Sequence, residues 1–291
     1  MAKTKIEWAE SSWNPIRARD LGPVGTGLGS GWHCEIVSPG CENCYAEAMN
    51  VRLGTHRQYR ASLRKKVNVY LDDKVLQYPL HLRLPRRIFV CSMTDLFGEW
   101  VPDEWLDSIF GVMTLCQKHI FQVLTKRPER MRDYLVKLAD RDILPTRIVD
   151  SASKLMPARD LRNLCWNYPV WPLPNVWSGA SVEDQRRCDE RLPLLRDTPA
   201  AVRWISYEPA LELVNLRLMQ DSHRGRISWV VVGGESGHGA RAFDTQWAMS
   251  AVLQCRDAGV ACFVKQITNG GRKVPFDSWP SDLKIREYPN A

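Results

Sequence analysis

Residues 88–124 read IFVCSMTDLFGEWVPDEWLDSIFGVMTLCQKHIFQVL, and this stretch decides the expected fold. It begins and ends with short apolar segments, 88–92 and 120–124, each of the length of a buried β-strand. Between them, residues 102–119 form an amphipathic segment that opens with Pro102 and two acidic residues, as the N-terminus of a helix prefers. A strand, a helix and a second strand in this order predict a βαβ unit with parallel strands.

The same alternation continues along the chain. Further strands are expected at 176–180, 202–206, 229–233 and 262–265, and one more before residue 31. Further helices are expected at 45–55, 127–139, 182–197 and 244–259. Asp244 is a suitable N-cap for the last helix, and Gly259 a suitable end.

This pattern predicts one α/β domain over residues 1–291, with insertions near 54–86 and 141–174. The expected architecture is a complete or partial (β/α) barrel with parallel strands, and a doubly wound sheet is the alternative. In either fold, ligands gather at the carboxyl ends of the strands.

The overall composition excludes some classes of protein. No stretch approaches the length of apolar sequence that a membrane span needs, and residues 1–15 lack the apolar core of a signal peptide. We therefore expect a cytoplasmic protein that does not enter a membrane. The net charge of +7 is compatible with nucleic-acid binding but does not establish it.

Charged or hydroxyl-bearing residues directly follow each expected strand. A glycine-rich loop, residues 233–239, also follows one of them, and its backbone N–H groups can approach a ligand closely. Because these residues would meet at one edge of the sheet, they predict a ligand-binding rim. The residues are Ser92, Asp95, Lys126, Arg127, Ser181, Glu183, Tyr207, Glu208, Glu235, Arg241, Lys265 and Gln266.

Three cysteines, Cys34, Cys41 and Cys44, lie close together in a loop that contains Pro39 and Gly40. The other six cysteines are scattered, several of them in apolar runs where a reduced cysteine packs as a small hydrophobic residue. The cluster has three interpretations. It is a chance grouping, or a Cys₃His zinc site completed by His33 or His56, or the ligand set of a [4Fe–4S] cluster with one iron left open.

The cysteine loop and the expected barrel together resemble the radical S-adenosylmethionine (radical SAM) superfamily. The spacing here is a variant, CX6CX2C, in which Tyr45 follows the last cysteine. The chain is also similar to a phage-borne family of uncharacterised proteins with this three-cysteine motif. The similarity rests on the segments TKIEWAESSWNP, SPGCENCYAE, RIFVCSMTDLF, LTKRPERM, SVEDQ, VGGESGHGAR and FVKQ, which span nearly the full length.

The radical SAM resemblance implies a cofactor and a reaction. Cys34, Cys41 and Cys44 would bind three irons of a [4Fe–4S] cluster, and the amino and carboxylate groups of SAM would chelate the fourth. A reductant protein would supply the electron that cleaves SAM to a 5′-deoxyadenosyl radical. Cys91 and Tyr207 are candidate catalytic residues, since a thiol can donate a hydrogen atom to a product radical. Candidate residues for binding the cofactor are Tyr45, Ser92, Asp95, Lys126, Ser181, Glu183, Glu208 and Glu235.

Residues 52–66 suggest nucleic acid as the substrate, with DNA favoured. This segment has six Lys or Arg residues, no acidic residue and one interleaved Tyr, so it can follow a phosphate backbone. Repair or modification of a base is the expected reaction. The alternatives are a radical-SAM-like enzyme acting on a nucleotide or small metabolite, and a non-catalytic, zinc-stabilised nucleic-acid-binding protein. Candidate contacts to nucleic acid are Arg52, Arg57, Arg60, Arg64, Lys65, Lys66, Arg127 and Arg241.

Overall fold

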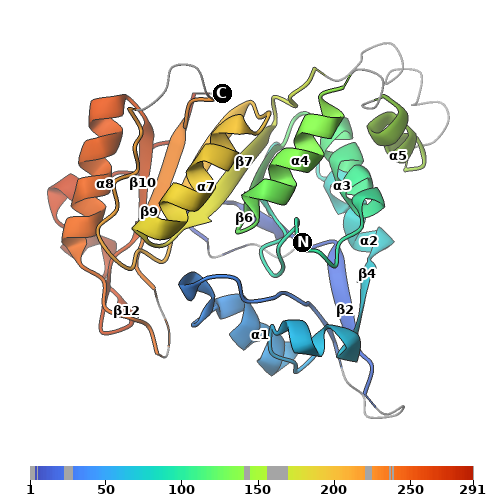
Figure 1. Ribbon diagram of the computed structural model, residues 1–291, viewed down its shortest axis with the longest axis horizontal. Helices are drawn as coiled ribbons and strands as arrows, with labels where there is room; N and C mark the ends of the chain where they lie inside the picture. The colour runs from blue at the N-terminus through green and yellow to red at the C-terminus, as the bar shows by residue number, and fades with distance from the viewer. Residues whose placement is uncertain are drawn as a thin grey trace.

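A curled sheet of seven parallel strands organises the computed structural model of the protein (Figure 1). The strands are β1 (Ser11–Trp13), β5 (Arg87–Val90), β6 (Ile120–Thr125), β7 (Val176–Val182), β8 (Val202–Tyr207), β9 (Trp229–Gly233) and β10 (Ala261–Gln266). The structure describes residue 4 and residues 6–22, 29–140, 145–155, 170–219, 225–235, 237 and 239–290.

The order of the strands identifies the fold as a partial barrel. The sheet runs β1-β5-β6-β7-β8-β9-β10, so each strand lies beside the next one in the chain order of this sheet. A doubly wound sheet would reverse its order at one point, and this sheet does not. Within the described residues, β1 and β10 are the two edges and do not pair with each other, so of the two expected forms, a complete or a partial barrel, the structure has the partial one.

Four helices lie between strands and cover the convex face of the sheet (Figure 1). Local sequence sets their ends. Asp244 accepts a hydrogen bond from the N–H of Gln246, and Gly259 closes the same helix with a φ of 59°. All five expected helices, these four and α1 (Tyr45–Leu53), and all six later strands are present, with shifts of a few residues at their ends. The helices are α3 (Asp103–Leu115), α4 (Pro128–Leu138), α7 (Gln185–Asp197) and α8 (Thr245–Ala258).

Alternation along each strand divides its side chains between the two faces of the sheet. In β8, Ile205 and Tyr207 point to the helices and join the main apolar core. Val202 and Trp204 point to the concave face and join a second, aromatic core. The curled sheet therefore has an interior of its own, separate from the helix layer.

Aromatic residues fill one half of this interior. The ring of Trp8 lies 5.2 Å from that of Trp204 and 4.7 Å from that of Phe89, while Trp204 and Trp229 are 5.1 Å apart. Trp8 belongs to the N-terminal segment, whose backbone accepts a hydrogen bond from Gln122 at 3.3 Å. The amino half of the barrel is therefore closed by packed rings. We call this cluster the aromatic floor; its members are Trp8, Phe89, Trp177, Trp204, Trp229 and Phe263.

A long excursion between β1 and β5 carries the cysteine loop. It contains α1 (Tyr45–Leu53), which ends at Gly54 as expected, and an antiparallel sheet in the order β3-β2-β4. The expected insertion at 54–86 is thus part of this excursion, and its strand β4 pairs with β2. The remaining elements of the excursion are β2 (Ile16–Asp20), β3 (Ser30–Gly31), η1 (Pro39–Cys41), η2 (Ala61–Lys66), β4 (Val67–Leu71), α2 (Asp73–Leu76) and η3 (Tyr78–His81).

The expected insertion at 141–174 lies partly outside the described residues. Its described part includes η4 (Pro145–Val149) and α5 (Asp150–Ser153), which pack against α3. The chain ends with β11 (Thr268–Asn269), β12 (Arg272–Lys273), η5 (Phe276–Ser278) and η6 (Ser281–Leu283).

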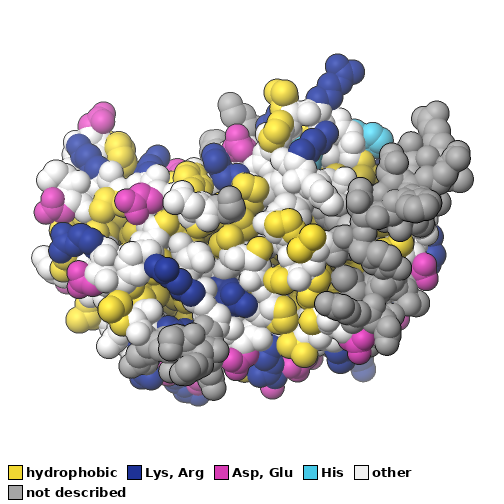
Figure 2. Space-filling model, turned by 90° about the horizontal axis from the view of Figure 1, so that it is seen from above, with side chains coloured by type: hydrophobic (Ala, Val, Ile, Leu, Met, Phe, Trp, Pro, Cys, Tyr) yellow, Lys and Arg dark blue, Asp and Glu magenta, His cyan; other side chains and the backbone are white. Residues whose placement is uncertain are grey.

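The outer surface gives two further findings. None of the helices in the described part of the chain has the length and apolar character that a membrane span requires. On the face that points away from α1, Lys and Arg side chains are interspersed with Asp and Glu around hydrophobic groups (Figure 2). The described part of that face therefore offers no continuous basic area.

Candidate functional site

A cavity of about 250 Å³ opens at the carboxyl ends of strands β5 to β10, between the sheet and the cysteine loop. The aromatic floor forms its inner wall through Trp8 and Phe89. The rim expected from the sequence is therefore a real cluster in space. The predicted site residues that line the cavity are Cys34, Cys41, Cys44, Tyr45, Cys91, Ser92, Asp95, Lys126, Arg127, Ser181, Glu208 and Glu235.

The three clustered cysteines all contribute to the wall of this one cavity. Burial raises the pKa of the Cys34 and Cys44 thiols, and positive charge opposes this effect, from Arg127 at Cys34 and from Lys126 at Cys44. Cys44 is also the N-cap of α1, where the N–H groups of Glu47 and Ala46 face its sulfur and lower its pKa. Burial outweighs the two cations and the helix N-terminus, so the pKa of both thiols lies above its ordinary value.

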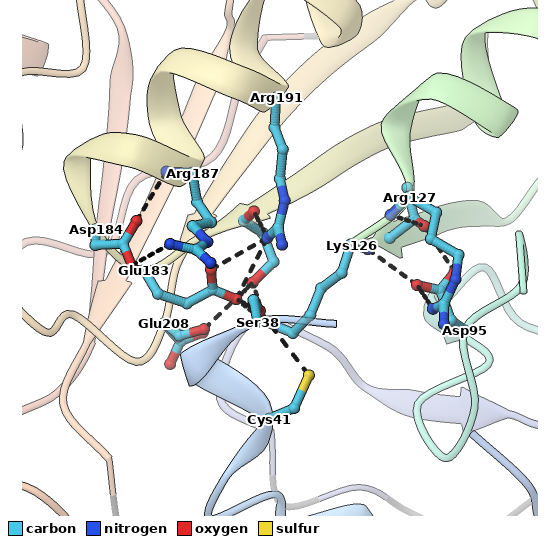
Figure 3. Close-up of polar contacts among 12 residues, drawn as sticks. Ser38, Cys41, Asp95, Lys126, Arg127, Glu183, Asp184, Arg187, Arg191 and Glu208 are labelled. Atoms are coloured by element: carbon cyan, nitrogen blue, oxygen red, sulfur yellow. Dashed lines mark hydrogen bonds and ion pairs between the residues drawn. The ribbon is translucent and has the colours of Figure 1, made fainter. Parts of the chain in front are cut away.

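Glu183, which is fully buried, holds one side of the cysteine loop. Its carboxylate accepts a hydrogen bond from Ser38 at 3.0 Å and pairs with Lys126 and with Arg191 (Figure 3). Burial would raise the pKa of Glu183, but the charges of Lys126 and Arg191 and the hydrogen bonds lower it below its usual value. A Cβ atom at Gly40 would come within 2.4 Å of the Glu183 side chain, so only glycine allows this close approach. Glu183 is not part of the cavity wall. Its carboxylate is engaged by Ser38 of the cysteine loop and by Lys126 and Arg191.

Glu235 holds the other side of the loop. It accepts a hydrogen bond from Asn43, between Cys41 and Cys44, at 2.9 Å, and pairs with Arg241 at 2.7 Å. Arg241 also pairs with Glu42 of the loop at 3.1 Å. Burial would raise the pKa of Glu235, but its hydrogen bonds from Arg241 lower it. The glycine-rich segment after β9 therefore contacts the cysteine loop, which sequence spacing did not reveal.

Asp95 organises the ends of β5 and β6. It accepts hydrogen bonds from the Thr125 hydroxyl at 2.6 Å and from the backbone N–H of Lys126 at 3.0 Å, and it pairs with Arg127 at 3.1 Å. Arg127 in turn donates to the backbone carbonyl of Glu35, next to Cys34, at 3.3 Å. Asp95 and Arg127 thus hold the start of the cysteine loop in place. Most of their hydrogen-bonding groups are already engaged within the protein.

Glu208 is the wall carboxylate with capacity for a ligand. Its Oε1 atom lies 2.8 Å from Lys265 Nζ, but it is buried and accepts no hydrogen bond within the described residues. Ser92, Ser181 and Ser206 line the same cavity, where the Ser92 hydroxyl is bonded to Asn14 and the Ser181 hydroxyl to Lys126. Together they form a polar surface that can bind the amino or hydroxyl groups of a small molecule.

The two candidate catalytic residues do not come together. Cys91 lines the cavity and is buried, and its φ of 55° turns the chain at the end of β5. Burial raises the pKa of its thiol. Tyr207 faces the helix layer instead, where its hydroxyl donates to the backbone carbonyl of Glu212. Only Cys91 is therefore placed to meet a ligand.

The basic segment 52–66 is partly neutralised by neighbouring acids. Arg57 pairs with Asp20 at 3.0 Å, Arg60 with Glu47 at 2.9 Å and Arg64 with Glu35 at 2.6 Å. Arg52, Lys65 and Lys66 are exposed, with no ion pair among the described residues. Half of the expected nucleic-acid contacts in this segment thus serve to hold the excursion in place.

Several wall residues were missed by sequence reasoning. Tyr59 donates a hydrogen bond to the backbone of Met93 at 2.7 Å and so joins the excursion to the end of β5. Trp8 gave no signal because it lies outside any periodic segment, whereas Lys265 and Gln266, both expected in the rim, do line the cavity. At the end of β9, behind the wall, Gly233 leaves room for Glu208, whose Oε1 would lie 2.9 Å from a Cβ atom there.

A metal site for a single ion is not preformed. No group of three or more His, Cys, Asp and Glu side chains in the described part of the chain is arranged to hold a metal ion. Neither histidine considered for zinc lines the cavity. His33 is 3.2 Å from Glu35 and packs against the ring of Trp100, and His56 contacts the backbone of Val51.

Fold and site together define a partial (β/α) barrel with a cysteine-lined cavity at the carboxyl ends of its strands. The chain belongs to a family of proteins of unknown function (DUF5131), whose pattern matches residues 3–275. No curated protein and no solved structure matches the chain.

Proposed function

We propose that this protein is a radical-SAM-like iron–sulfur enzyme that acts on nucleic acid, as a DNA base repair or modification enzyme. One observation carries the proposal: Cys34, Cys41 and Cys44 line a single cavity at the carboxyl ends of parallel strands. This is the edge of a (β/α) barrel where ligands bind and reactions occur.

The donor set suits a cluster better than a single zinc ion. A tetrahedral zinc site with bonds of about 2.3 Å would draw its sulfur ligands to about 3.8 Å from one another. A [4Fe–4S] cluster binds each thiolate through a different iron, so its ligands stand farther apart and surround a space. Since no histidine that could complete a zinc site lines the cavity beside the three cysteines, we favour the second case.

The chain's own residues would position the cofactors and exclude water. Glu183 and Glu235 hold the cysteine loop from opposite sides, through Ser38 and Asn43. Lys126 and Arg127 supply positive charge beside the thiolates. Glu208 and the hydroxyl groups of the wall would bind the amino and ribose groups of SAM, and the aromatic floor closes the inner end to water. When bound, the cluster would pass an electron from a reductant protein to SAM and so supply radical chemistry.

The proposal is tested on protein reconstituted without oxygen. We expect about four irons and four sulfides per chain. Reduction with dithionite should release 5′-deoxyadenosine from SAM, and single-stranded DNA should increase that release. Cys41→Ala should lose the iron, whereas Cys116→Ala, in the core behind α3, should keep it.

Three results would contradict the proposal. Bound zinc without iron would make the protein a zinc-stabilised module. A full complement of iron in Cys41→Ala would remove the ligand assignment. Release of 5′-deoxyadenosine that responds to nucleotides but never to DNA would move the substrate to a small metabolite.

A further inference from the structure

The sheet β3-β2-β4 presents an outward face of basic, aromatic and small polar side chains. Ile16 and Ala18 point inward and are buried, so the alternate residues Arg17 and Arg19 point outward. In the antiparallel register, Arg17 lies opposite Tyr70, and Arg19 lies opposite Asn68. Together with Ser30 of β3, these five residues form what we call the outer face.

The aromatic rings of this region are stacked against arginine side chains. The guanidinium carbon of Arg17 lies 4.4 Å from the ring centre of Trp32, and that of Arg19 lies 5.1 Å from the ring centre of Tyr70. Ser30 links the two pairs, since its hydroxyl is 3.3 Å from Arg17 and 3.0 Å from the Tyr70 hydroxyl. Each guanidinium group thus lies over an aromatic ring, within the range of a cation–π contact, and guanidinium groups and rings are both surfaces on which a base can stack.

The charged side chains of the outer face are all positive, and the exposed acid nearest to β4 is Asp73, beyond its C-terminal end. Lys65 and Lys66, exposed at the end of η2, lead directly into β4 and extend the outer face. The nearest acid along β2, Asp20, has a side chain only 1% exposed and is bound by Arg57. No acidic residue belongs to the outer face, so it is complementary to a polyanion.

The outer face adjoins the cavity. Trp32 packs beside Cys34 and Cys44 in the small apolar cluster around Tyr59 and Met93, both of which line the cavity. At the start of β2, Asn14 donates a hydrogen bond to the Ser92 hydroxyl on the cavity wall at 3.2 Å. A single strand of nucleic acid bound to the outer face could therefore extend to the mouth of the cavity, beside the cysteine loop.

We propose that the outer face, with Trp32, Lys65 and Lys66, is the docking surface for single-stranded DNA. Arginine and lysine would neutralise phosphates, while unpaired bases stack on the guanidinium groups and rings, an arrangement that paired and stacked bases of a duplex cannot adopt. The inference deepens the proposed function, because it gives the nucleic-acid substrate a path to the cavity. Binding itself needs no cluster, so the two proposals can fail separately.

The test measures the fluorescence anisotropy of a labelled 20-nucleotide DNA of mixed sequence, with full-length protein before and after cluster reconstitution. The double variant Arg17→Ala/Arg19→Ala should weaken binding at least tenfold and reduce the slope of log K against log salt by about 1.4, for two phosphate contacts. The matched control is Arg186→Ala/Arg256→Ala, which removes the same charge from exposed positions on α7 and α8. It should change affinity less than twofold.

A second pair of variants tests stacking apart from charge. Tyr70→Ala should weaken binding about tenfold, whereas Tyr70→Phe, which keeps the ring, should bind like the unchanged protein. Equal losses in both double variants would overturn the docking surface, as would tighter binding of duplex DNA or of RNA of the same sequence. Loss of DNA binding with normal release of 5′-deoxyadenosine would support the docking surface and leave the cofactor proposal intact.

Discussion

The two halves of the barrel interior are built from the same strands but differ in what fills them. In β8, Trp204 belongs to the aromatic floor, Ser206 lines the cavity two residues later, and Glu208 does so after two more. In β9, Trp229 belongs to the floor, and Glu235 lies at the mouth. The amino half is filled by its own side chains, whereas the carboxyl half keeps a cavity and holds its charges in pairs.

This difference indicates where stability and function are located. Packed rings release water from large apolar areas and so stabilise the fold. Charged pairs at the mouth gain little net free energy, because each group loses its hydration on burial. We therefore expect substitutions in the floor to change mainly the stability of the fold, and substitutions at the mouth to change mainly ligand binding. The following predictions test this division.

Replacing a floor residue should have the largest effect on stability. Trp204→Ala removes a fully buried ring that contacts Trp8 and Trp229, and we expect a loss of about 4 kcal/mol in the free energy of unfolding. Chemical denaturation measures this value. Trp105→Ala, at a half-buried position on α3, is the control and should cost clearly less. Equal losses would show that the floor has no special role.

Glu183→Gln should have the next largest effect, since it leaves Arg191 and Lys126 without their buried partner. We expect a loss of about 3 kcal/mol in the free energy of unfolding. Without the carboxylate, the cost of removing the charged partners from water is no longer offset by an ion pair. The exposed pair on α7 supplies the control, as Glu190→Gln should cost less than about 0.5 kcal/mol. A small loss for Glu183→Gln would mean that the loop does not depend on this tether.

The contacts of Glu235 with Asn43 and Arg241 should make the stability of the protein depend moderately on pH. The folded pKa of Glu235 is below its ordinary value of 4.5, so the carboxylate stabilises the fold above that value and loses this contribution as the pH falls through the folded pKa. The difference in melting temperature between the unchanged protein and Glu235→Gln should thus be largest near pH 7 and shrink below pH 4.5. A difference that stays constant over this range would exclude the ionised carboxylate as the cause.

Glu208→Gln should have the smallest effect on stability and a clear effect on binding. Its carboxylate faces the cavity and has one ion-pair partner, Lys265, so we expect less than about 1 kcal/mol of change. Isothermal titration of SAM into the reconstituted protein should show about tenfold weaker binding. If stability falls as far as in Trp204→Ala, the mouth and the floor are not divided as we describe.

The sequence predicted the layers of the fold because local patterns produce them. Apolar runs such as 229–233 are buried on both faces of a parallel sheet, and the cap at Asp244 and the glycine at 259 fix a helix without help from the rest of the chain. The strand ends were found for the same reason, and their meeting at one edge follows from parallel pairing. The meeting of Lys126 and Glu208 was therefore within reach of the sequence, whereas the three cysteines join them from the excursion between β1 and β5, whose position parallel pairing does not predict.

Long-range packing decided what sequence patterns could not. Whether the barrel closes depends on pairing between the edge strands, and no local pattern encodes it. Tyr207 was misplaced because alternation in a strand gives two faces but does not say which one meets the helices. The partners of the basic residues in 52–66, such as Asp20 for Arg57, lie far away in the chain, so charge counting overestimated the free positive surface. By itself the sequence determined the elements and the edge at which chemistry gathers; the tertiary structure decided which charges remain available there, because ion pairs and burial depend on neighbours brought together only by folding.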